Sequence, residues 1–460
     1  MKTLLFVISD LHLGGDSEYR ICSAKGQELL TGFLKWAAAQ AVTDQVHLVV
    51  NGDSVDFLAE QAFSAFTTDQ TAAAAKLSNI FTENSQIWDG FASVVKTGAR
   101  VTFLLGNHDL ELSFPEPRRL LLEKLGPGQV EFIYDNQALT VGDVLIEHGN
   151  TYDRWNKADD NGLRHARAEV SRHQQIDNFT APPGSRLVFE IMNPLKHDFH
   201  FVNLLKPENQ AAIPILGILR PSVLARIPKL APLALAALTR RDTGVVAGSL
   251  AGPQSDLDPD DQDAMNLANS LAFPADSAAV AGNLLQNLRD KWRAFTQGVK
   301  RKSQIQTLRT AISFYMGPNL IAFDTQNESP DYKNAAEKSA ALGFRVITYG
   351  HTHLAKRVPL ANGAVYLNSG TWADMMCIPD DLLLAGGDES DKALESYLDD
   401  LIENRLDNWI GQLPTFVRIE LQDGKTSDAD VWIYGGGDQA TRMPDGRLSR
   451  LLNKSKAASR

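Results

Sequence analysis

The sequence predicts an α/β (α+β) core that is interrupted by a large, mainly helical insertion. Apolar runs of strand length alternate with helical patterns over residues 1–150 and again over residues 343–440, and this alternation is typical of layered α/β folds. Residues 151–342 read instead as helices and irregular segments with proline in the middle. Short polar clusters follow several strand-like runs, and ligand sites in such sheets form where strands end. We therefore expect these clusters to meet.

Apolar periodicity places the elements of the first stretch. Continuous apolar runs predict buried strands, and apolar residues at helical spacing predict helices. Gly98 and Gly126 are helix stop signals, and Gly142-Asp143 is a turn signal. We expect strands at 4–8, 47–50, 101–105, 131–134 and 139–147, and helices at 25–41, 71–97 and 117–125.

The second stretch completes the expected core. Asn362-Gly363 is a strong turn pair between two short strand-like runs. We expect strands at 344–349, 357–360, 364–368, 416–421 and 430–434, and a helix at 390–406. Residues 441–460 form a basic tail, which we interpret as a frayed end; attachment to an anionic surface is the alternative.

Composition restricts the class of protein. The chain has 460 residues, of which 43% are hydrophobic and 22% are charged, as expected of a globular protein. Its formal net charge of −11 disfavours broad nucleic-acid binding. Cys22 and Cys377 give neither a disulfide framework nor a thiolate zinc site, which favours a cytoplasmic location. We interpret residues 1–8 as a strand rather than a signal peptide, and we expect no transmembrane helix.

The polar clusters gather a scarce residue type. The chain has ten histidines, and five of them lie in these clusters. A pair of divalent metal ions requires such a grouping, because neutral imidazoles, carboxylates and an amide oxygen are suitable ligands. The clusters are Asp10-Leu11-His12, Gly52-Asp53, Gly106-Asn107-His108-Asp109, His148-Gly149 and Gly350-His351-Thr352-His353.

These side chains favour a particular chemistry. Asp10 and His12 project to the same face of an extended backbone and can reach one metal, while the two oxygens of Asp53 can bridge two. Mixed nitrogen and oxygen shells suit Mn, Fe, Zn, Co or Ni better than Mg or Ca alone. Two metals about 3.5–4 Å apart would clamp a phosphoryl oxygen and acidify a bridging water. We expect Asp109 to orient His108, which would stabilise phosphate charge or protonate the leaving oxygen.

The clusters resemble the pattern of the calcineurin-like metallophosphoesterase superfamily, which runs D-x-H, G-D-x-x-[DE], G-N-H-[DE], H and G-H-x-H. The second block here is Gly52-Asp53-Ser54-Val55-Asp56, and residues 368–372 also resemble a segment of many bacterial members. The resemblance covers residues 1–150 and 344–374. It is strongest toward the bacterial branch that includes UDP-2,3-diacylglucosamine pyrophosphatase, although that enzyme is shorter and has arginine where this chain has His108.

The resemblance implies a four-layer α-β-β-α sandwich of two mixed sheets. It does not extend to residues 151–342, which we interpret as a helical cap from their own sequence pattern. It also implies hydrolysis of a phosphate monoester, diester or pyrophosphate by metal-bound hydroxide, with His108 and Asp109 as an acid dyad. Two divalent ions are implied, and manganese is the first candidate. One ion would be held by Asp10, His12, Asp53 and His353, and the other by Asp53, Asn107, His148 and His351.

Alternatives stay open for the function and for the cap. A nuclease or cyclic-nucleotide phosphodiesterase is the alternative enzyme, and a protein-interaction scaffold that retains a metal site is the alternative of another class. Arg154 could clamp a substrate phosphate or form a surface salt bridge. The proline-broken apolar stretch 211–238 could be cap core or a peripheral membrane surface. We interpret the remaining histidines as structural or solvent-exposed: His47, His165, His173, His197 and His200.

Overall fold

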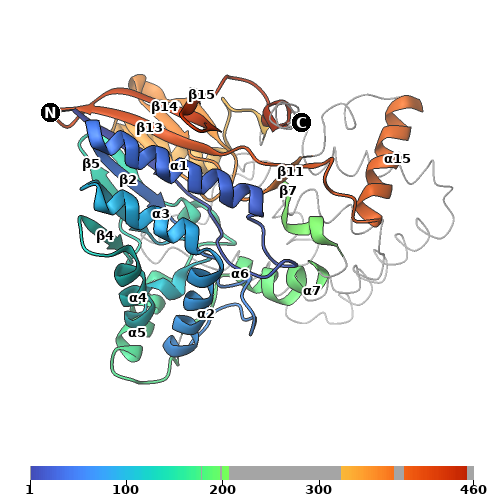
Figure 1. The fold of residues 1–460 in the computed structure, drawn as a ribbon, viewed down its shortest axis with the longest axis horizontal. Coiled ribbons are helices and arrows are strands. Elements are labelled where there is room, and N and C mark those ends of the chain that lie inside the picture. The colour runs from blue at the N-terminus through green and yellow to red at the C-terminus, as the bar shows by residue number, and fades with distance from the viewer. Residues whose placement is uncertain (1, 178, 197–198, 207–322, 378–387, 453–460) are drawn as a thin grey trace, which may run out of the picture.

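The computed structural model describes residues 2–177, 179–196, 199–206, 323–377 and 388–452 (Figure 1). The apolar stretch 211–238 and His197 lie outside these residues. Nowhere in the described chain is a helix both long enough and apolar enough to cross a membrane.

A seven-stranded mixed sheet forms the centre of the fold, in the order β15-β14-β13-β1-β2-β3-β4. β1, β2, β3 and β4 are parallel to one another. β13, β14 and β15 extend the sheet through antiparallel pairs. The strands are β1 (Lys2–Ile8), β2 (Gln45–Asn51), β3 (Arg100–Leu104), β4 (Val130–Ile133), β13 (Thr415–Gln422), β14 (Lys425–Gly436) and β15 (Gln439–Arg442).

A second mixed sheet has five strands in the order β5-β6-β8-β10-β9. Its three middle strands are parallel, and both edge strands pair antiparallel. The strands are β5 (Leu139–Val141), β6 (Val144–Ile146), β8 (Val346–Tyr349), β9 (Lys356–Pro359) and β10 (Val365–Asn368). A small third sheet joins β12 (Ile410–Gly411), β11 (Met375–Cys377) and β7 (Leu205–Lys206).

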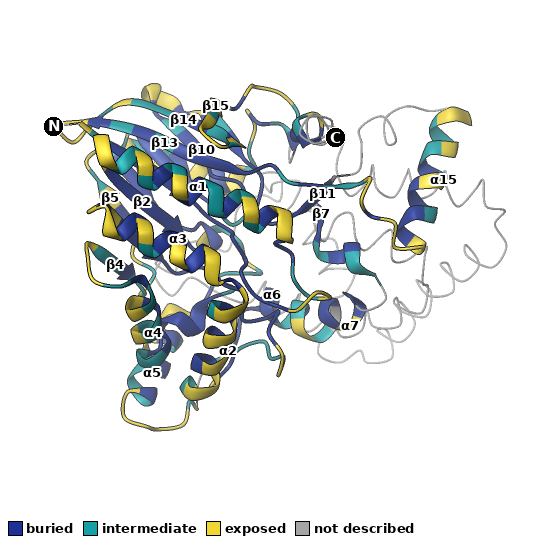
Figure 2. Cartoon of the chain, viewed as in Figure 1, coloured by how far each residue is buried: buried dark blue, intermediate teal, exposed yellow. Residues whose placement is uncertain are grey.

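Helices α1 (Ala24–Thr43) and α3 (Ser85–Lys96) cover the outer face of the seven-stranded sheet (Figure 1). Phe33 of α1 and Trp88 of α3 pack there in one buried cluster with Phe6 of β1. Their opposite faces are exposed (Figure 2), as expected of amphipathic helices on a sheet.

The two sheets face each other, and α13 (Pro330–Ala341) covers the far side of the second sheet. Val7 and Val49 of the first sheet share a buried cluster with Ile146 of the second. On the far side, Ala336 of α13 packs with Ile347 of β8. These four layers confirm the expected sandwich of two mixed sheets between helices.

The remaining helices lie around the ends of the sheets. α5 and α13 fall within the range expected for the cap, yet Leu163 and Ala336 pack into core clusters. The helices are α2 (Gln70–Glu83), α4 (Pro115–Leu125), α5 (Asp160–Val170), α6 (Pro183–Leu187), α7 (Asn193–Lys196) and α15 (Asp388–Ile402). The short helical turns are η1 (Leu110–Ser113), η2 (Asn150–Tyr152), η3 (Val188–Met192), η4 (His200–Asn203) and η7 (Ala361–Gly363).

Two expected segments differ from the structure. The helical region expected at 71–97 consists of two helices, α2 and α3, divided at Asn84, whose backbone leaves helical geometry at φ −116° and ψ 30°. Asn84 Nδ2 donates to the Ile80 carbonyl at 2.8 Å and so caps the end of α2. In the basic tail, Leu448 and Leu452 are each 1% exposed, so the described part of that segment packs against the core.

Candidate metal centre

Five loops converge where parallel strands end. Asp10 follows β1, Asp53 follows β2, and Asn107 follows β3 in the first sheet, while His148 follows β6 and His351 follows β8 in the second. Backbone hydrogen bonds join the loops. Leu11 N donates to the Asp53 carbonyl at 2.9 Å, and Gly350 N donates to the His148 carbonyl at 2.9 Å. The two sheets thus bring clusters that are far apart in sequence to one place, as expected.

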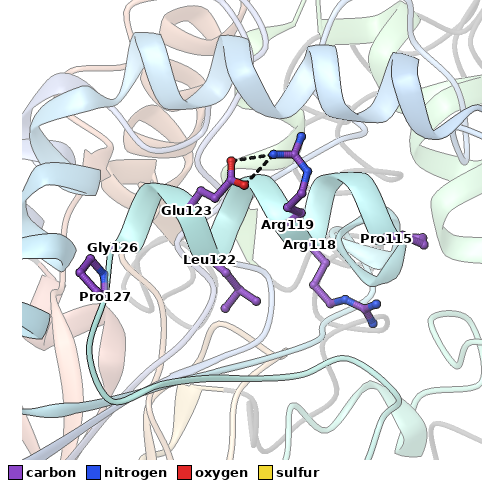
Figure 3. Close-up of a pocket in the computed structure, with 7 residues that line it drawn as sticks. All are labelled: Pro115, Arg118, Arg119, Leu122, Glu123, Gly126 and Pro127. Carbon is purple, nitrogen blue, oxygen red and sulfur yellow. Dashed lines mark hydrogen bonds and ion pairs between the residues drawn. The ribbon is translucent and has the colours of Figure 1, made fainter.

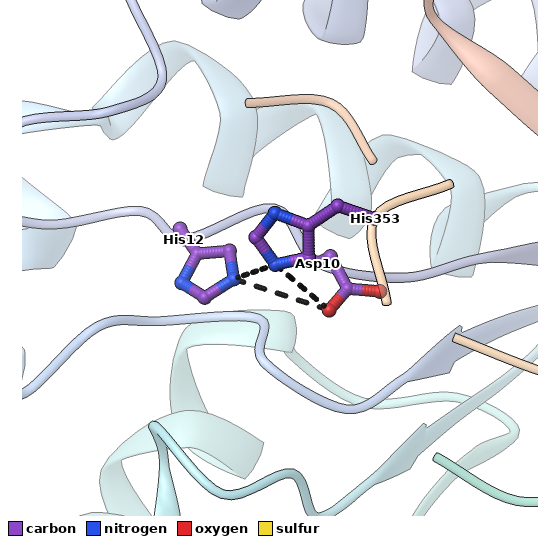
Figure 4. A group of neighbouring side chains, drawn as sticks. All are labelled: Asp10, His12 and His353. Atoms are coloured by element: carbon purple, nitrogen blue, oxygen red, sulfur yellow. Dashed lines mark hydrogen bonds and ion pairs between the residues drawn. The ribbon is translucent and has the colours of Figure 1, made fainter. Parts of the chain in front are cut away.

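Asp10, His12 and His353 form the first group of candidate ligands (Figure 4). Nε2 of His12 lies 2.9 Å from Nε2 of His353. Oδ1 of Asp10 lies 3.4 Å from Nε2 of His353 and 3.9 Å from Nε2 of His12. All three residues are buried, so a carboxylate oxygen and two imidazole nitrogens point toward one point within the protein.

Asp53, His148 and His351 form the second group. Oδ2 of Asp53 lies 3.2 Å from Nε2 of His148 and 3.8 Å from Nε2 of His12 in the first group. The rings of His148 and His351 stand edge to face with centroids 5.3 Å apart. The Asp53 carboxylate therefore belongs to the second group and also lies close to His12 of the first.

Two of the histidines have hydrogen-bond partners at Nδ1, the nitrogen that faces away from the group. Their Nε2 atoms are therefore available to bind a metal ion. His12 Nδ1 lies 3.2 Å from Oδ2 of Asp56, and His148 Nδ1 lies 2.8 Å from the Asn51 carbonyl. A histidine that donates through Nδ1 presents the lone pair of Nε2, which is how metal-binding histidines are usually held.

The carboxylates and the amide are held in the same way. Oδ2 of Asp10 accepts from the His351 backbone N–H at 2.9 Å, and Oδ1 of Asp53 accepts from the His108 backbone N–H at 2.8 Å. Among the described residues, Oδ1 of Asp10 and Oδ1 of Asn107 are buried without a hydrogen bond. Buried acceptors that lack a donor are costly, and a cation would satisfy both. This donor set suits divalent transition metals.

The charges of the carboxylates and imidazoles in this site act on one another. Burial raises the pKa of Asp10, but His353, whose Nε2 lies 3.4 Å from Oδ1, outweighs it and brings the pKa to about 2. Burial lowers the pKa of His148, but the charge of Asp53 outweighs it and brings the pKa to about 10. The pKa of Asp53 is held well below its ordinary value by His148 and His108 despite burial. A divalent cation would take the place of these protons.

The candidate ligands also share an unusual backbone conformation. Few non-glycine residues adopt positive φ, and when they do the strain often marks a functional site. Five of the expected ligands do so: Asp10 (φ 53°), His12 (φ 45°), Asp53 (φ 48°), His351 (φ 68°) and His353 (φ 62°). A Cβ at Gly106 would lie 2.1 Å from Asp53 Oδ1, so only glycine fits beside that carboxylate. The loops are therefore shaped around these side chains.

The comparison with known families agrees with this geometry. Residues 4–203 match the family model described as Metallophos, calcineurin-like phosphoesterase. Over these residues, the chain is similar to the calcineurin-like phosphoesterases. No curated protein matches it significantly. Divalent metal ions are the cofactors implied for such a phosphoesterase, and the two groups of side chains are candidate ligands in it.

His108 lies at the open side of the candidate metal centre. Its side chain is 20% exposed, whereas that of Asp53 is 1% exposed. The His108 ring stands edge to face against the His12 ring, with centroids 4.7 Å apart. His108 thus lies against His12 of the first group and is partly exposed, and its expected role over the metal ions stays a prediction.

A different aspartate from the one expected lies beside His108. Oδ1 of Asp56 is 3.2 Å from His108 Nδ1. The Asp109 carboxylate instead accepts from the backbone N–H groups of Ser54 at 2.8 Å and Gly106 at 2.7 Å, so it holds the two ligand loops together. Burial and the charge of Asp53 raise the pKa of Asp109 to about 6. The sequence analysis gave Asp56 no role. Its position in the G-D-x-x-[DE] block, three residues after Asp53, is the sequence signal that could have identified it.

Arg154 and the remaining described histidines are not among the candidate ligands. Arg154 is exposed on the turn after η2, and its role in substrate binding stays a prediction. Buried His47 pairs with Thr102 Oγ1 at 2.9 Å, as a structural histidine would. His165 and His173 are exposed, and His200 is half-buried.

A hollow is lined by residues of α4 and of the turn that follows it (Figure 3). Arg119 pairs with Glu123 there at 2.7 Å, one helical turn apart. The hollow contains none of the candidate ligands, so it is not a candidate active site. Its lining residues are Pro115, Arg118, Arg119, Leu122, Glu123, Gly126 and Pro127.

Proposed function

We propose that this protein hydrolyses a phosphate ester or pyrophosphate with a pair of divalent metal ions. Asp10, His12 and His353 would hold one ion, and Asn107, His148 and His351 would hold the other, with Asp53 as the shared ligand. The observation that carries the proposal is the position of Asp53 Oδ2, 3.2 Å from His148 Nε2 and 3.8 Å from His12 Nε2. A carboxylate between two sets of imidazoles is suited to bridge two cations.

The protein would contribute binding, orientation and proton transfer. When bound, a pair of divalent ions supplies positive charge that polarises a phosphoryl group and acidifies water. His108 is the partly exposed imidazole over the site, and Asp56 Oδ1 lies 3.2 Å from its Nδ1. With Nδ1 held by Asp56, Nε2 of His108 is directed to the substrate, where it can stabilise phosphate charge or protonate the leaving oxygen.

Manganese is the first candidate metal, because the mixed set of imidazole, carboxylate and amide ligands suits Mn, Fe, Zn, Co or Ni. Arg154 is a candidate for binding a phosphate oxygen of the substrate. Residues 151–342 would restrict access to the centre and so determine which esters enter, as lids over active sites do. We keep a cytoplasmic location as part of this proposal.

A metal-supplemented activity screen tests the proposed function. Purified full-length protein, stripped of metal and reloaded with Mn²⁺, Co²⁺, Zn²⁺ or Mg²⁺, is assayed against phosphate monoesters, phosphodiesters, nucleotides and lipid-linked pyrophosphates. We expect turnover with at least one transition metal and loss of turnover in chelator.

The Asp53→Asn variant is the control for contaminating phosphatases, and it should lack that activity. Failure of every class of phosphate ester under all metals would contradict the proposal and favour a scaffold that only retains the site. A preference for DNA or RNA that declines steeply with salt would identify a nuclease instead.

A further inference from the structure

Asp153 lies beside a candidate metal ligand, although it belongs to none of the polar clusters. It follows η2, and its Oδ2 lies 3.0 Å from Nε2 of His351. The two residues are 198 positions apart in the chain, so this is a tertiary contact between loops of the second sheet. The His351 side chain is 7% exposed and that of Asp153 is 27% exposed. The contact is therefore at the rim of the centre.

The contact selects which nitrogen of His351 faces the metal position. A carboxylate next to Nε2 accepts a hydrogen bond from Nε2–H, and in that neutral tautomer the lone pair is on Nδ1. Nδ1 is then the atom available to the group of Asp53 and His148. His12 and His148 are held the opposite way round, through Nδ1. Each of these three imidazoles thus has a protein acceptor on the nitrogen that does not face the centre.

Asp153 is itself held firmly in its turn. Its Oδ1 accepts from the Trp155 backbone N–H at 2.8 Å, and its Oδ2 also accepts from Asn156 Nδ2 at 2.6 Å. These two hydrogen bonds fix the carboxylate in position, as the orientation of an imidazole requires.

Helix α6, in the first part of the insertion, packs directly on this turn. Gly184 N donates to the Trp155 carbonyl at 2.7 Å. A Cβ at Gly184 would lie 2.0 Å from Asn156 Oδ1, so a side chain at that position would require the Asn156 amide to move. The Asn156 amide therefore contacts α6 on one side and Asp153 on the other. The insertion and the metal centre share this turn.

We propose that Asp153 is a positioning residue that fixes the ring of His351, and that the packing of α6 acts on the same carboxylate through Asn156. The inference rests on the proposed binuclear centre. It assigns Asp153 to one ion only, the one near Asp53, His148 and His351. The ion near Asp10 and His12 should be unaffected, because no described contact joins Asp153 to those residues.

Mn²⁺ binding to the full-length protein tests the role of Asp153. Metal-free wild type, Asp153→Ala and Asp153→Asn are titrated with Mn²⁺, and bound metal per chain is measured together with the electron paramagnetic resonance signal of a coupled Mn pair. We expect two ions in wild type, and a second ion bound about 10- to 100-fold more weakly in Asp153→Ala. Asp153→Asn should lie between them, because an amide keeps one acceptor oxygen.

The matched control is Asp159→Ala, which removes an aspartate that only caps α5 through Gly162 N at 3.0 Å. It should bind both ions as wild type does. Thermal unfolding of the metal-free proteins separates positioning from folding, since Asp153→Asn should unfold near the wild-type temperature. Two ions of wild-type affinity in Asp153→Ala would overturn the inference alone. Fewer than two ions in wild type would overturn the proposed function as well.

The Gly184→Ala substitution tests the link to α6. The added methyl should displace the Asn156 amide from Asp153. The ion near Asp53, His148 and His351 should then bind more weakly, as it does in Asp153→Ala. In an Asn156→Ala background there is no amide to displace, so Gly184→Ala should cause no further loss of affinity for that ion. Wild-type binding of the second ion by Gly184→Ala would overturn the link to α6.

Discussion

Oδ1 of Asp56 lies 3.2 Å from Nδ1 of His108, and Oδ2 of the same carboxylate lies 3.2 Å from Nδ1 of His12. One buried aspartate therefore holds both the imidazole over the site and an imidazole that faces the first metal position. Burial raises the pKa of Asp56, but the charge of His108 and the hydrogen bonds outweigh it and lower the pKa well below its ordinary value. Asp56 thus remains an anion at neutral pH.

His108→Ala should slow turnover while both metal ions stay bound. His108 reaches the open side of the centre, and loss of a general acid or of a donor to the phosphate typically costs about 10²- to 10⁴-fold in rate. The measurement is kcat for an activated phosphate ester beside the metal content of the same preparation. Loss of both ions would show that His108 is a ligand instead.

Asp56→Asn should lower kcat by about 10- to 100-fold, the usual effect of removing a residue that orients a metal-site histidine. Because Asp56 acts partly through His108, its effect on kcat in a His108→Ala background should be much smaller. Kinetics of the two single variants and the double variant at saturating Mn²⁺ measure this coupling. Full additivity would contradict a shared role.

Asp53→Asn should empty both metal positions, since the neutral amide replaces the one carboxylate next to both groups. Asn107→Ala is the comparison, because Asn107 is expected to serve only the second position. Metal analysis after dialysis against micromolar Mn²⁺ should give near zero for the first variant and about one ion for the second. Two bound ions in Asp53→Asn would show that Asp53 is not the shared ligand.

Gly52→Ala should disturb the centre, and Gly98→Ala should not. Both glycines have positive φ, 81° and 87°, so both substitutions strain the backbone by about 1–2 kcal/mol. Only the Cβ at residue 52 would meet a ligand, at 2.4 Å from His148 Nδ1, while nothing lies within 4 Å of the Cβ at residue 98. Denaturation should therefore show a larger loss of stability for Gly52→Ala than for Gly98→Ala, and metal titration should show a loss of binding for Gly52→Ala alone.

Glu111 should make the fold less stable as pH rises from 4.5 to 7. Burial raises its pKa from 4.5 to about 7, although Thr67 N donates to Oε1 at 2.7 Å. In this window the folded state binds more protons than the unfolded state, so stability declines with pH, by about 3 kcal/mol at about 1.4 kcal/mol per pKa unit. Urea denaturation at pH 5 and pH 8 should show a smaller decline for Glu111→Gln; an equal decline in both proteins would contradict this role.

Much of the fold follows from patterns that are local in the sequence. Apolar runs predicted the strands that became β1, β2 and β3, and the polar residues after them identified where the loops would meet. Asn362-Gly363 predicted the connection between β9 and β10, which pair antiparallel. The break at Asn84 was missed because α2 and α3 continue one apolar pattern, and only the backbone at Asn84 divides them.

The partners of the site residues were harder to predict than the clusters themselves. Asp109 is adjacent to His108 in sequence, yet its carboxylate is directed to backbone N–H groups of Ser54 and Gly106. Asp56 reaches the His108 ring from another loop. The contact of Asp153 with His351 joins loops 198 residues apart. Such pairs depend on how the loops fold over one another. The spacing of residues along the chain does not by itself specify which side chains meet.

Anomalous diffraction from crystals grown with Mn²⁺ tests the central claim most directly. The account predicts two manganese peaks about 3.5–4 Å apart, one at Asp10, His12 and His353, the other at Asn107, His148 and His351, with the Asp53 carboxylate between them. Absence of manganese at these residues, or a single peak that leaves His148 and His351 uncoordinated, would contradict it.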